Sequence, residues 1–189
     1  AFKVQGTLAI TNSAESEIDG VISDGDSAGI ITKAGNAKLT LSGNNTFTGA
    51  VTVNAGRLQI THANGLGGTD GATTVADEGR LNINGGLTIA EAITINGTGD
   101  SSKGALHFNG GNNTVSGNIT LGADAKIHSH IGTQTISGTI NGAHGLTITG
   151  TDDFTISGII GGSTVLDSVA ATITNSGTFT VGANITTSG

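Results

Sequence analysis

Short stretches of alternating apolar and polar residues recur along this chain at intervals of about 20 to 25 residues. One recurring pattern, Thr-apolar-Ser/Thr-Gly, ends at Gly49, Gly117, Gly138 and Gly158, and its last three copies follow one another at nearly equal spacing. A second pattern, leucine followed two positions later by an aliphatic residue or, after Leu106, by Phe108, begins at Leu39, Leu58, Leu81, Leu106 and Leu146. One structural unit explains both series if the long gap from Gly49 to Gly117 contains three units.

A repeat of this length that contains only short strands and turns predicts a parallel β-solenoid. The alternation places aliphatic side chains on one face of each strand, and Gly, Asn, Asp or Ser residues separate the strands. We therefore predict an all-β fold in which residues 1–189 form one continuous solenoid of roughly nine coils. A β-sandwich also has short alternating strands, but it does not require a repeated sequence and its core usually contains aromatic residues.

The composition excludes several classes of protein. The chain has no Cys, so it has no disulfides, and its core must be built with five Phe as the only aromatic residues. The net charge of −7, with five Lys and two Arg scattered along the sequence, argues against a nucleic-acid partner. No apolar run approaches the length of a membrane-spanning helix, so we expect a chain that does not span a membrane.

Residues 39–60, with the sequence LTLSGNNTFTGAVTVNAGRLQI, resemble the autotransporter-associated β-strand repeat, which is typical of autotransporter passenger regions. Residues 104–121 and 145–162 match the same pattern more loosely. The resemblance implies a single right-handed parallel β-helix that is exported and displayed at the bacterial cell surface, an extracellular location. It implies no catalytic residues, because the repeat itself has none.

Parallel β-helices also include polysaccharide-active enzymes, so we searched for catalytic groups. Asp152 and Asp153, near His144 in the sequence, are similar to the carboxylate pair and histidine of polygalacturonase-like enzymes. The other motifs of those enzymes, Asn-Thr-Asp and Arg-x-Lys, are missing, and two Asp residues between strands commonly cap a turn. We therefore predict that the chain is not an enzyme and has no catalytic residues and no cofactor.

Three histidines form the other candidate cluster. His128 and His130 lie on one face of a predicted strand, and His107, which precedes His128 by one repeat length, is placed to stack one coil away. Three neighbouring imidazoles are a possible site for zinc or copper. No Cys or carboxylate nearby in the sequence completes such a site, so we predict a solvated or pH-sensitive histidine face and no metal.

The strand patterns near the two ends of the chain indicate which partners it could have. Residues 2–8 and 178–185 both have the pattern of solenoid strands, with no polar or helical cap. The leading hypothesis is a structural or adhesive surface rod, a stalk or adhesin that contacts host or cell-surface ligands. The alternative is a self-assembling extracellular filament whose subunits stack end to end. A polysaccharide-active enzyme, with Asp152, Asp153 and His144 in one groove, is the remote alternative.

Overall fold

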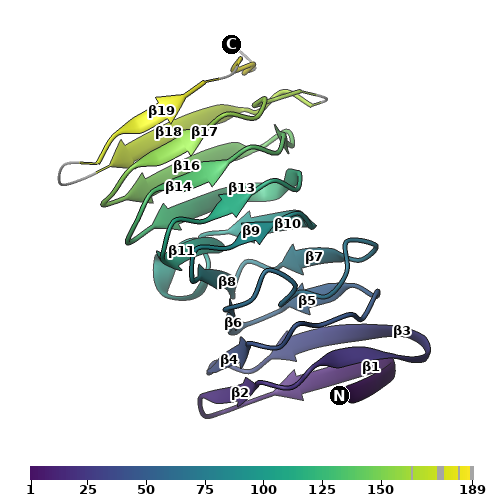
Figure 1. Cartoon of the computed structure of the whole chain (residues 1–189). Helices are drawn as coiled ribbons and strands as arrows, with labels where there is room; N and C mark the ends of the chain where they lie inside the picture. The colour runs from purple at the N-terminus through teal and green to yellow at the C-terminus, as the bar shows by residue number, and fades with distance from the viewer. Residues whose placement is uncertain (163, 174–176, 183, 188–189) are drawn as a thin grey trace.

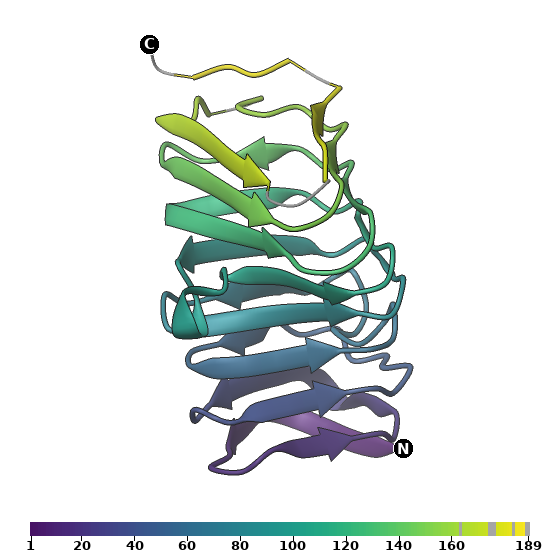
Figure 2. The ribbon, with the colours of Figure 1, turned by 90° about the vertical axis from the view of Figure 1, so that its left-hand side faces the viewer.

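The computed structural model describes residues 1–162, 164–173, 177–182 and 184–187, and its strands lie one above another in a stack (Figure 1 and Figure 2). All pairings between the named strands are parallel. Within the described residues, the 3-10 turn η1 (Asp100–Ser102) is the one helical element. The predicted all-β class and parallel β-solenoid are confirmed.

The strands form three ladders along the stack. The first ladder contains β1 (Phe2–Thr11), β3 (Ile22–Ala34), β5 (Val51–Val53), β7 (Ala72–Val75), β10 (Ala92–Gly97), the start of β13 (Ile119–Ser129) and β15 (Ile140–Asn141). The second contains β2 (Ser16–Ile18), β4 (Lys38–Leu41), β6 (Gly56–Ile60), β8 (Gly79–Asn84), β11 (Leu106–Gly110), the end of β13, β16 (Gly145–Gly150) and β18 (Ser168–Ile173). The third contains β9 (Thr88–Ile89), β12 (Thr114–Val115), β14 (Gln134–Ile136), β17 (Phe154–Ile156) and β19 (Phe179–Val181).

The number of coils follows from the second ladder, which has eight rungs from β2 to β18. The stack of about eight coils is close to the roughly nine predicted. The small excess in the prediction arises because some coils are longer than the shortest repeat. Leu81 and Leu106, for example, occupy adjacent rungs although the η1 turn lengthens the chain between them.

The core consists of aliphatic side chains stacked in columns. One column of the second ladder runs through six positions, each no more than 1% exposed: Leu39, Leu58, Leu81, Leu106, Ile127 and Ile148. In a parallel ladder, residues at equivalent positions of successive coils pair with one another. Each aliphatic side chain therefore packs between similar side chains of the coils before and after it. Ile148, which pairs with Ile127, therefore points into the core.

Glycine occupies a corner where successive coils approach closely. A Cβ atom on Gly138 would lie 2.0 Å from the carbonyl oxygen of Gly117, and one on Gly117 would lie 2.0 Å from that of Glu91. The gap between Gly49 and Gly117 contains three coils, as predicted, since Gly71 and Glu91 occupy the same corner in the intervening coils. Glu91 is thus an exception within a column of glycines.

Buried amides hold another corner together. Asn113 and Gln134, both 0% exposed, lie in adjacent coils, and the Nδ2 group of Asn113 donates to Oε1 of Gln134 at 2.9 Å. Gln134 Nε2 donates to the carbonyl oxygens of Gly111 and Gly132. These hydrogen bonds satisfy polar groups that would otherwise be costly to bury.

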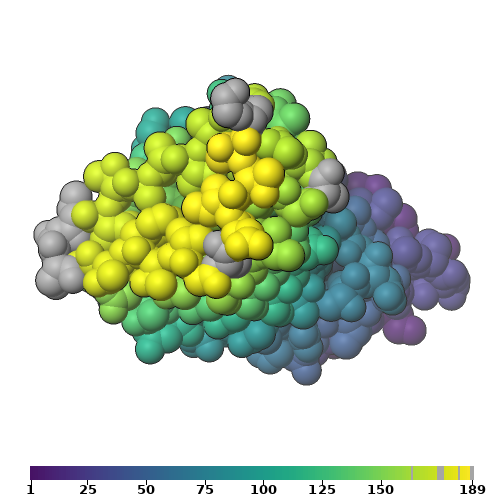
Figure 3. Space-filling view, turned by 90° about the horizontal axis from the view of Figure 1, so that it is seen from above, coloured from purple at the N-terminus to yellow at the C-terminus, as the bar shows by residue number. Residues whose placement is uncertain are grey.

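The first coil leaves apolar side chains uncovered at the N-terminal end of the stack. Phe2 is 53% exposed, and with Leu8, Ile10 and Ile18 it lines a hollow of about 390 Å³. Seen from the opposite end (Figure 3), the yellow C-terminal coil faces the viewer and the purple N-terminal coils project to one side. Successive coils are therefore offset along the stack.

Candidate functional site

A pocket of about 400 Å³ lies on the outer side of the second ladder, over β6, β8, β11 and β13. Its lining combines basic side chains with three histidines. The lining residues that bear charge or titrate are Arg57, Arg80, Asp100, Lys103, His107, His128 and His130.

The basic side chains come together because they occupy equivalent positions in successive coils. Lys38 pairs in register with Arg57, and Arg57 with Arg80. Each precedes the leucine of its strand, so each points outward while that leucine points into the core. Lys126 precedes Ile127 in the same way two coils beyond Arg80. We call these four residues the basic column.

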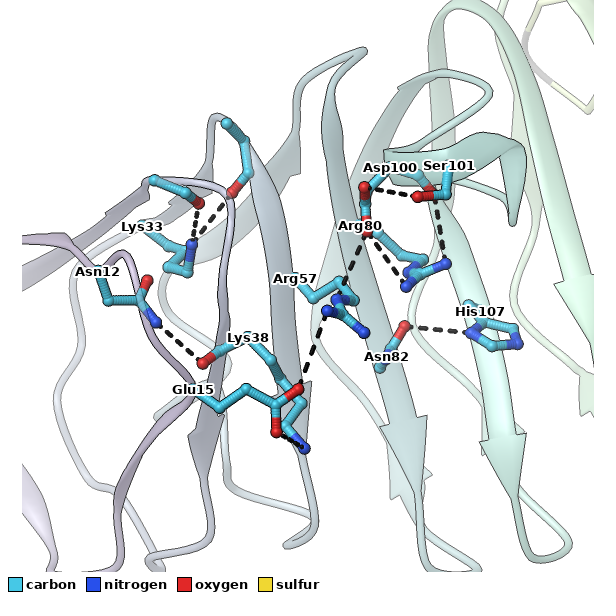
Figure 4. Close-up of polar contacts among 12 residues, drawn as sticks. Asn12, Glu15, Lys33, Lys38, Arg57, Arg80, Asn82, Asp100, Ser101 and His107 are labelled. Atoms are coloured by element: carbon cyan, nitrogen blue, oxygen red, sulfur yellow. Dashed lines mark hydrogen bonds and ion pairs between the residues drawn. The ribbon is translucent and has the colours of Figure 1, made fainter.

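Asp100 neutralises the two arginines in part, as Figure 4 shows. Its Oδ2 atom lies 3.5 Å from Nε of Arg57 and 3.3 Å from Nη2 of Arg80. Arg80 also donates from Nη1 to the Asp100 carbonyl oxygen at 3.2 Å. Glu15 pairs with Lys38 at 3.1 Å and lies 3.9 Å from Arg57, further along the column.

Asp100 reaches the arginines from the η1 turn, which protrudes between β10 and β11. Ser101 and Ser102 have φ values of 56° and 54°, which are uncommon for residues other than glycine. Gly99 has a φ of 73°, and a Cβ atom there would lie 2.3 Å from the carbonyl oxygen of Gly104. The turn therefore depends on glycine, and it holds a carboxylate over the basic column.

Arg80 is the buried anchor of the pocket, with 5% of its surface exposed. Burial lowers the pKa of its guanidinium, the nearby Arg57 lowers it further, and Asp100 raises it. Its Nε atom has no hydrogen-bond partner. A guanidinium group remains charged in proteins, so the pocket keeps a fixed positive charge in its wall.

The histidines lie beside the arginines. His107 pairs in register with His128, as predicted, and their ring centroids are 5.2 Å apart. The rings of His107 and His130 are 6.4 Å apart. Nδ1 of His107 lies 3.2 Å from Oδ1 of Asn82, and Nδ1 of His128 lies 2.8 Å from Oγ1 of Thr149.

Two of these imidazoles are neutral at pH 7. Burial, together with the positive charge of Arg80, lowers the pKa of His107 to about 3. Burial and the nearby Lys126 lower the pKa of His128 to about 4. A solvated side chain, one half of the prediction of a solvated or pH-sensitive face, is not found at His107, which is 7% exposed because Asn82, His128 and His130 lie against its ring.

The geometry gives no support to a metal centre here. Within the described ranges, no group of three or more His, Cys, Asp or Glu side chains is arranged to hold a metal ion. The neighbouring Arg80 and Lys103 add positive charge beside His107, which opposes binding of a cation.

Asp152, Asp153 and His144 do not share one groove. The two aspartates line a hollow with Asn112, Thr133 and neighbouring glycines, and His144 is not part of its lining. Asp152 accepts a hydrogen bond from the Gly132 amide at 2.9 Å, and Asp153 accepts one from the Thr178 amide at 2.8 Å. Both carboxylates thus cap turns, while His144 lies 4.0 Å from Asp124. That the chain is not an enzyme stays a prediction.

Reasoning from the sequence missed the basic column, because Lys38, Arg57, Arg80 and Lys126 are scattered along the chain. The signal that identifies the column is the residue before the core aliphatic of each coil, which is Lys or Arg in four of the six coils from Leu39 to Ile148 and is Ala105 or Thr147 in the other two. The gathering of positive charge appears only when the repeats are aligned coil by coil.

One protein-family model matches a segment of the chain. Residues 31–60 match the family model described as Passenger-associated-transport-repeat. This segment is similar to a passenger-associated-transport-repeat. This match contains the repeat predicted at residues 39–60 and confirms the resemblance to autotransporter passenger repeats, whereas the looser repeats at 104–121 and 145–162 stay predictions.

The passenger-associated-transport-repeat covers the C-terminal part of β3 together with β4, β5 and β6. It therefore supplies Arg57 and Lys38 of the basic column. No curated protein and no solved structure matches the chain. In the part of the chain that the structure describes, no helix has the length and apolar character needed to cross a bilayer.

Proposed function

We propose that the chain is a rigid structural or adhesive element of an autotransporter-type passenger, displayed outside the cell. The observation that carries this proposal is that the strands of the segment matching the passenger-associated-transport-repeat pair in register with the strands of the coils before and after it. β4 pairs with β2 before it, and β6 pairs with β8 after it, with no change of direction or register in either pairing. A stack of parallel coils with a dry aliphatic core is suited to a stiff spacer or stalk.

Surface display tests the proposal. The chain, with an epitope at its N-terminal end, is fused to the membrane translocator of an autotransporter, and intact cells are probed with antibody and then with protease. We expect the epitope to be accessible and the rod to resist protease. A matched fusion carrying Ile148→Asp should reach the surface but be digested. Retention of the unaltered chain inside the cell, or immediate digestion, would contradict the proposal.

Adhesion is read in a separate arm of the same experiment. Cells that display the chain are compared with cells that display the translocator alone, on surfaces coated with host-cell glycans or matrix proteins. Greater attachment by the first population is expected of an adhesin. Equal attachment, with display intact, assigns the chain a stalk role and removes the adhesive one.

The uncovered N-terminal coil favours end-to-end assembly as a second candidate function. Phe2, Leu8 and Ile10 leave an apolar hollow there, and Ile185 in the last described coil is 47% exposed. Another coil with parallel backbone and aliphatic side chains fits such an end by β-augmentation. Electron microscopy of the purified chain should then show filaments. Leu8→Lys should abolish them and the outward-facing control Ala9→Lys should not; isolated rods at high concentration would exclude assembly.

A further inference from the structure

The pocket beside the basic column concentrates positive charge on a chain whose net charge is −7. Arg57, Arg80 and Lys103 line it, and Asp100 is the one carboxylate in its lining. Lys103 forms no ion pair with any described residue, and its side chain is exposed. With His107 and His128 neutral, the charged side chains of the lining leave an excess of two positive charges before any contribution from His130.

We propose that this pocket is a binding site for the carboxylate group of an acidic sugar. The position of Asp100 shows that a carboxylate fits between the two guanidinium groups, 3.5 Å from Arg57 and 3.3 Å from Arg80. Arginine favours planar carboxylates because its donors form a rigid fork. Asp100 thus occupies the place between the two guanidinium groups that a ligand carboxylate would take, and it pairs with them only in part.

The remaining lining favours a hydroxylated ligand over a simple anion. Asn36, Asn109 and Ser101 line the pocket and provide side-chain donors and acceptors suited to sugar hydroxyls. The volume of about 400 Å³ is enough for one sugar unit and lies at the small end of ligand pockets. The site opens on the side of the rod, so further units of a polymer can continue along the basic column toward Lys38 or Lys126.

Buried polar atoms without hydrogen-bond partners lie in the wall of this pocket. Nε of Arg80 and Nε2 of His107 both lack a hydrogen-bond partner, in side chains that are 5% and 7% exposed. Leaving a buried polar atom without a partner is costly. The Arg80 atom is an N–H donor, whereas Nε2 of the neutral His107 is an acceptor, because Nδ1 carries the proton that faces Oδ1 of Asn82. A ligand that draws the η1 turn outward gives these atoms partners that Asp100 alone does not provide.

Ligand binding in this pocket is independent of surface display, and calorimetric titration of the purified chain tests it directly. The probes are glucuronate, glucose as the uncharged match, and inorganic phosphate as an anion without a sugar ring. We expect glucuronate to bind, glucose not to bind, and phosphate to bind more weakly. Equal binding of phosphate and glucuronate would reduce the site to a general anion site and overturn the sugar assignment. No binding of either anion would overturn the site.

Charge variants locate the binding. Arg57→Gln should weaken glucuronate binding at least about tenfold, the value of a charge-assisted hydrogen bond. Lys103→Gln should weaken it several-fold. Lys3→Gln removes the same charge from the exposed surface of β1, outside the pocket, and should leave the affinity unchanged. Equal losses in Lys3→Gln and Lys103→Gln would show only long-range attraction and would contradict the pocket.

Asp100→Asn separates a ligand site from a structural ion-pair network. Removal of the internal carboxylate should tighten glucuronate binding about tenfold, because the ligand no longer competes with Asp100 for the arginines. In a merely structural network, the same change lowers the melting temperature and creates no affinity. Lower stability without tighter binding, in a variant that still folds, would therefore overturn the proposal.

Discussion

Thr73 donates a hydrogen bond of 2.7 Å from its hydroxyl to the Glu91 carboxyl group inside the core. Both residues are exceptions in their columns. Thr73, 0% exposed, lies between Val51 and Ile93 in a column of aliphatic residues, and Glu91, 4% exposed, occupies a corner that glycine holds in neighbouring coils. The second carboxyl oxygen of Glu91 has no partner. Two polar side chains thus compensate each other where the repeat pattern fails.

This pair makes stability depend on pH. Burial raises the pKa of Glu91 to about 7, while in the unfolded chain it titrates near 4.5. The folded state therefore holds a proton that the unfolded state has lost, so the contribution of Glu91 decreases as pH rises from about 4.5 to 7. Glu91→Gln should be close to the wild type near pH 5 and exceed its free energy of unfolding by about 3 kcal/mol at pH 8.

Urea unfolding at several pH values measures this difference. The comparison with Glu91→Gln is needed because His107 and His128 produce the opposite slope over part of the same range. A difference between wild type and Glu91→Gln that stays constant from pH 5 to pH 8 would contradict a buried, proton-binding Glu91.

The stacked histidines His107 and His128 should make the stability of the rod sensitive to acid. His107 has a pKa of about 3 in the fold and of 6.5 when unperturbed, so the unfolded chain binds a proton that the fold excludes. Stability is then fully present above about pH 6.5 and is lost as pH falls toward the folded value. His107→Asn, which continues the position of Asn82, should reduce the loss between pH 6.5 and pH 5 by about 2 kcal/mol.

The same urea series checks this prediction. His128→Asn should act in the same direction, since burial also lowers the pKa of His128, to about 4. An acid slope that is identical in wild type and both variants would show that these imidazoles are protonated in the folded rod.

The buried column of aliphatic residues from Leu39 to Ile148 predicts the effect of placing a charge in the core. Ile148→Asp places a carboxylate among packed aliphatic side chains and should destabilise the rod by at least about 4 kcal/mol. Thr147→Asp, one residue away on the exposed face, is the matched control and should change little. Circular dichroism and thermal melting measure both variants. Equal melting temperatures would mean that the register of β16 is wrong.

The corner glycines predict a steric effect. Gly138→Ala would place a Cβ atom 2.0 Å from the carbonyl oxygen of Gly117, so adjacent coils must separate. We expect a loss of about 1 to 3 kcal/mol in thermal unfolding. Gly20→Ala is the control, since no atom lies within 4 Å of its added Cβ. Similar melting of the two variants would contradict close approach at this corner.

The architecture could be predicted from the sequence because each coil of a solenoid repeats the same pattern of residues. The leucines from Leu39 to Leu106 and the corner glycines repeat at the coil length, and parallel stacking then fixes which residues pair. The stacking of His107 on His128 followed from the same arithmetic. The coil number was slightly high because the prediction used the shorter coils as its unit.

The exceptions could not be predicted in the same way. Lys33 carries a charge, which is typical of an outward residue, yet it lies two positions after the inward Ile31, is 0% exposed and pairs with Val53 in an inward column. Its Nζ group donates hydrogen bonds to the carbonyl oxygens of Gly35 and Ala55. Burial of this charge is therefore possible only because the turn of the next coil places the Ala55 carbonyl beside it. The position of Asp100 likewise depends on the η1 turn, whose length and left-handed serines are features of one coil and not of the repeat.

One distance series tests the continuous stack most directly. A single outward column runs through all eight rungs of the second ladder: Glu17, Thr40, Gln59, Asn82, His107, His128, Thr149 and Thr172. The chain has no native Cys, so spin labels can be placed at two chosen positions and the distance measured by pulsed electron paramagnetic resonance.

Labels at Glu17→Cys and Thr172→Cys are seven rungs apart and should be about 34 Å apart, at about 4.8 Å per rung. Labels at Gln59→Cys and Thr172→Cys, five rungs apart, should be about 24 Å apart, and both distributions should be narrow. Distances that do not scale with the number of rungs, or distributions spread over tens of ångströms, would contradict a continuous parallel rod.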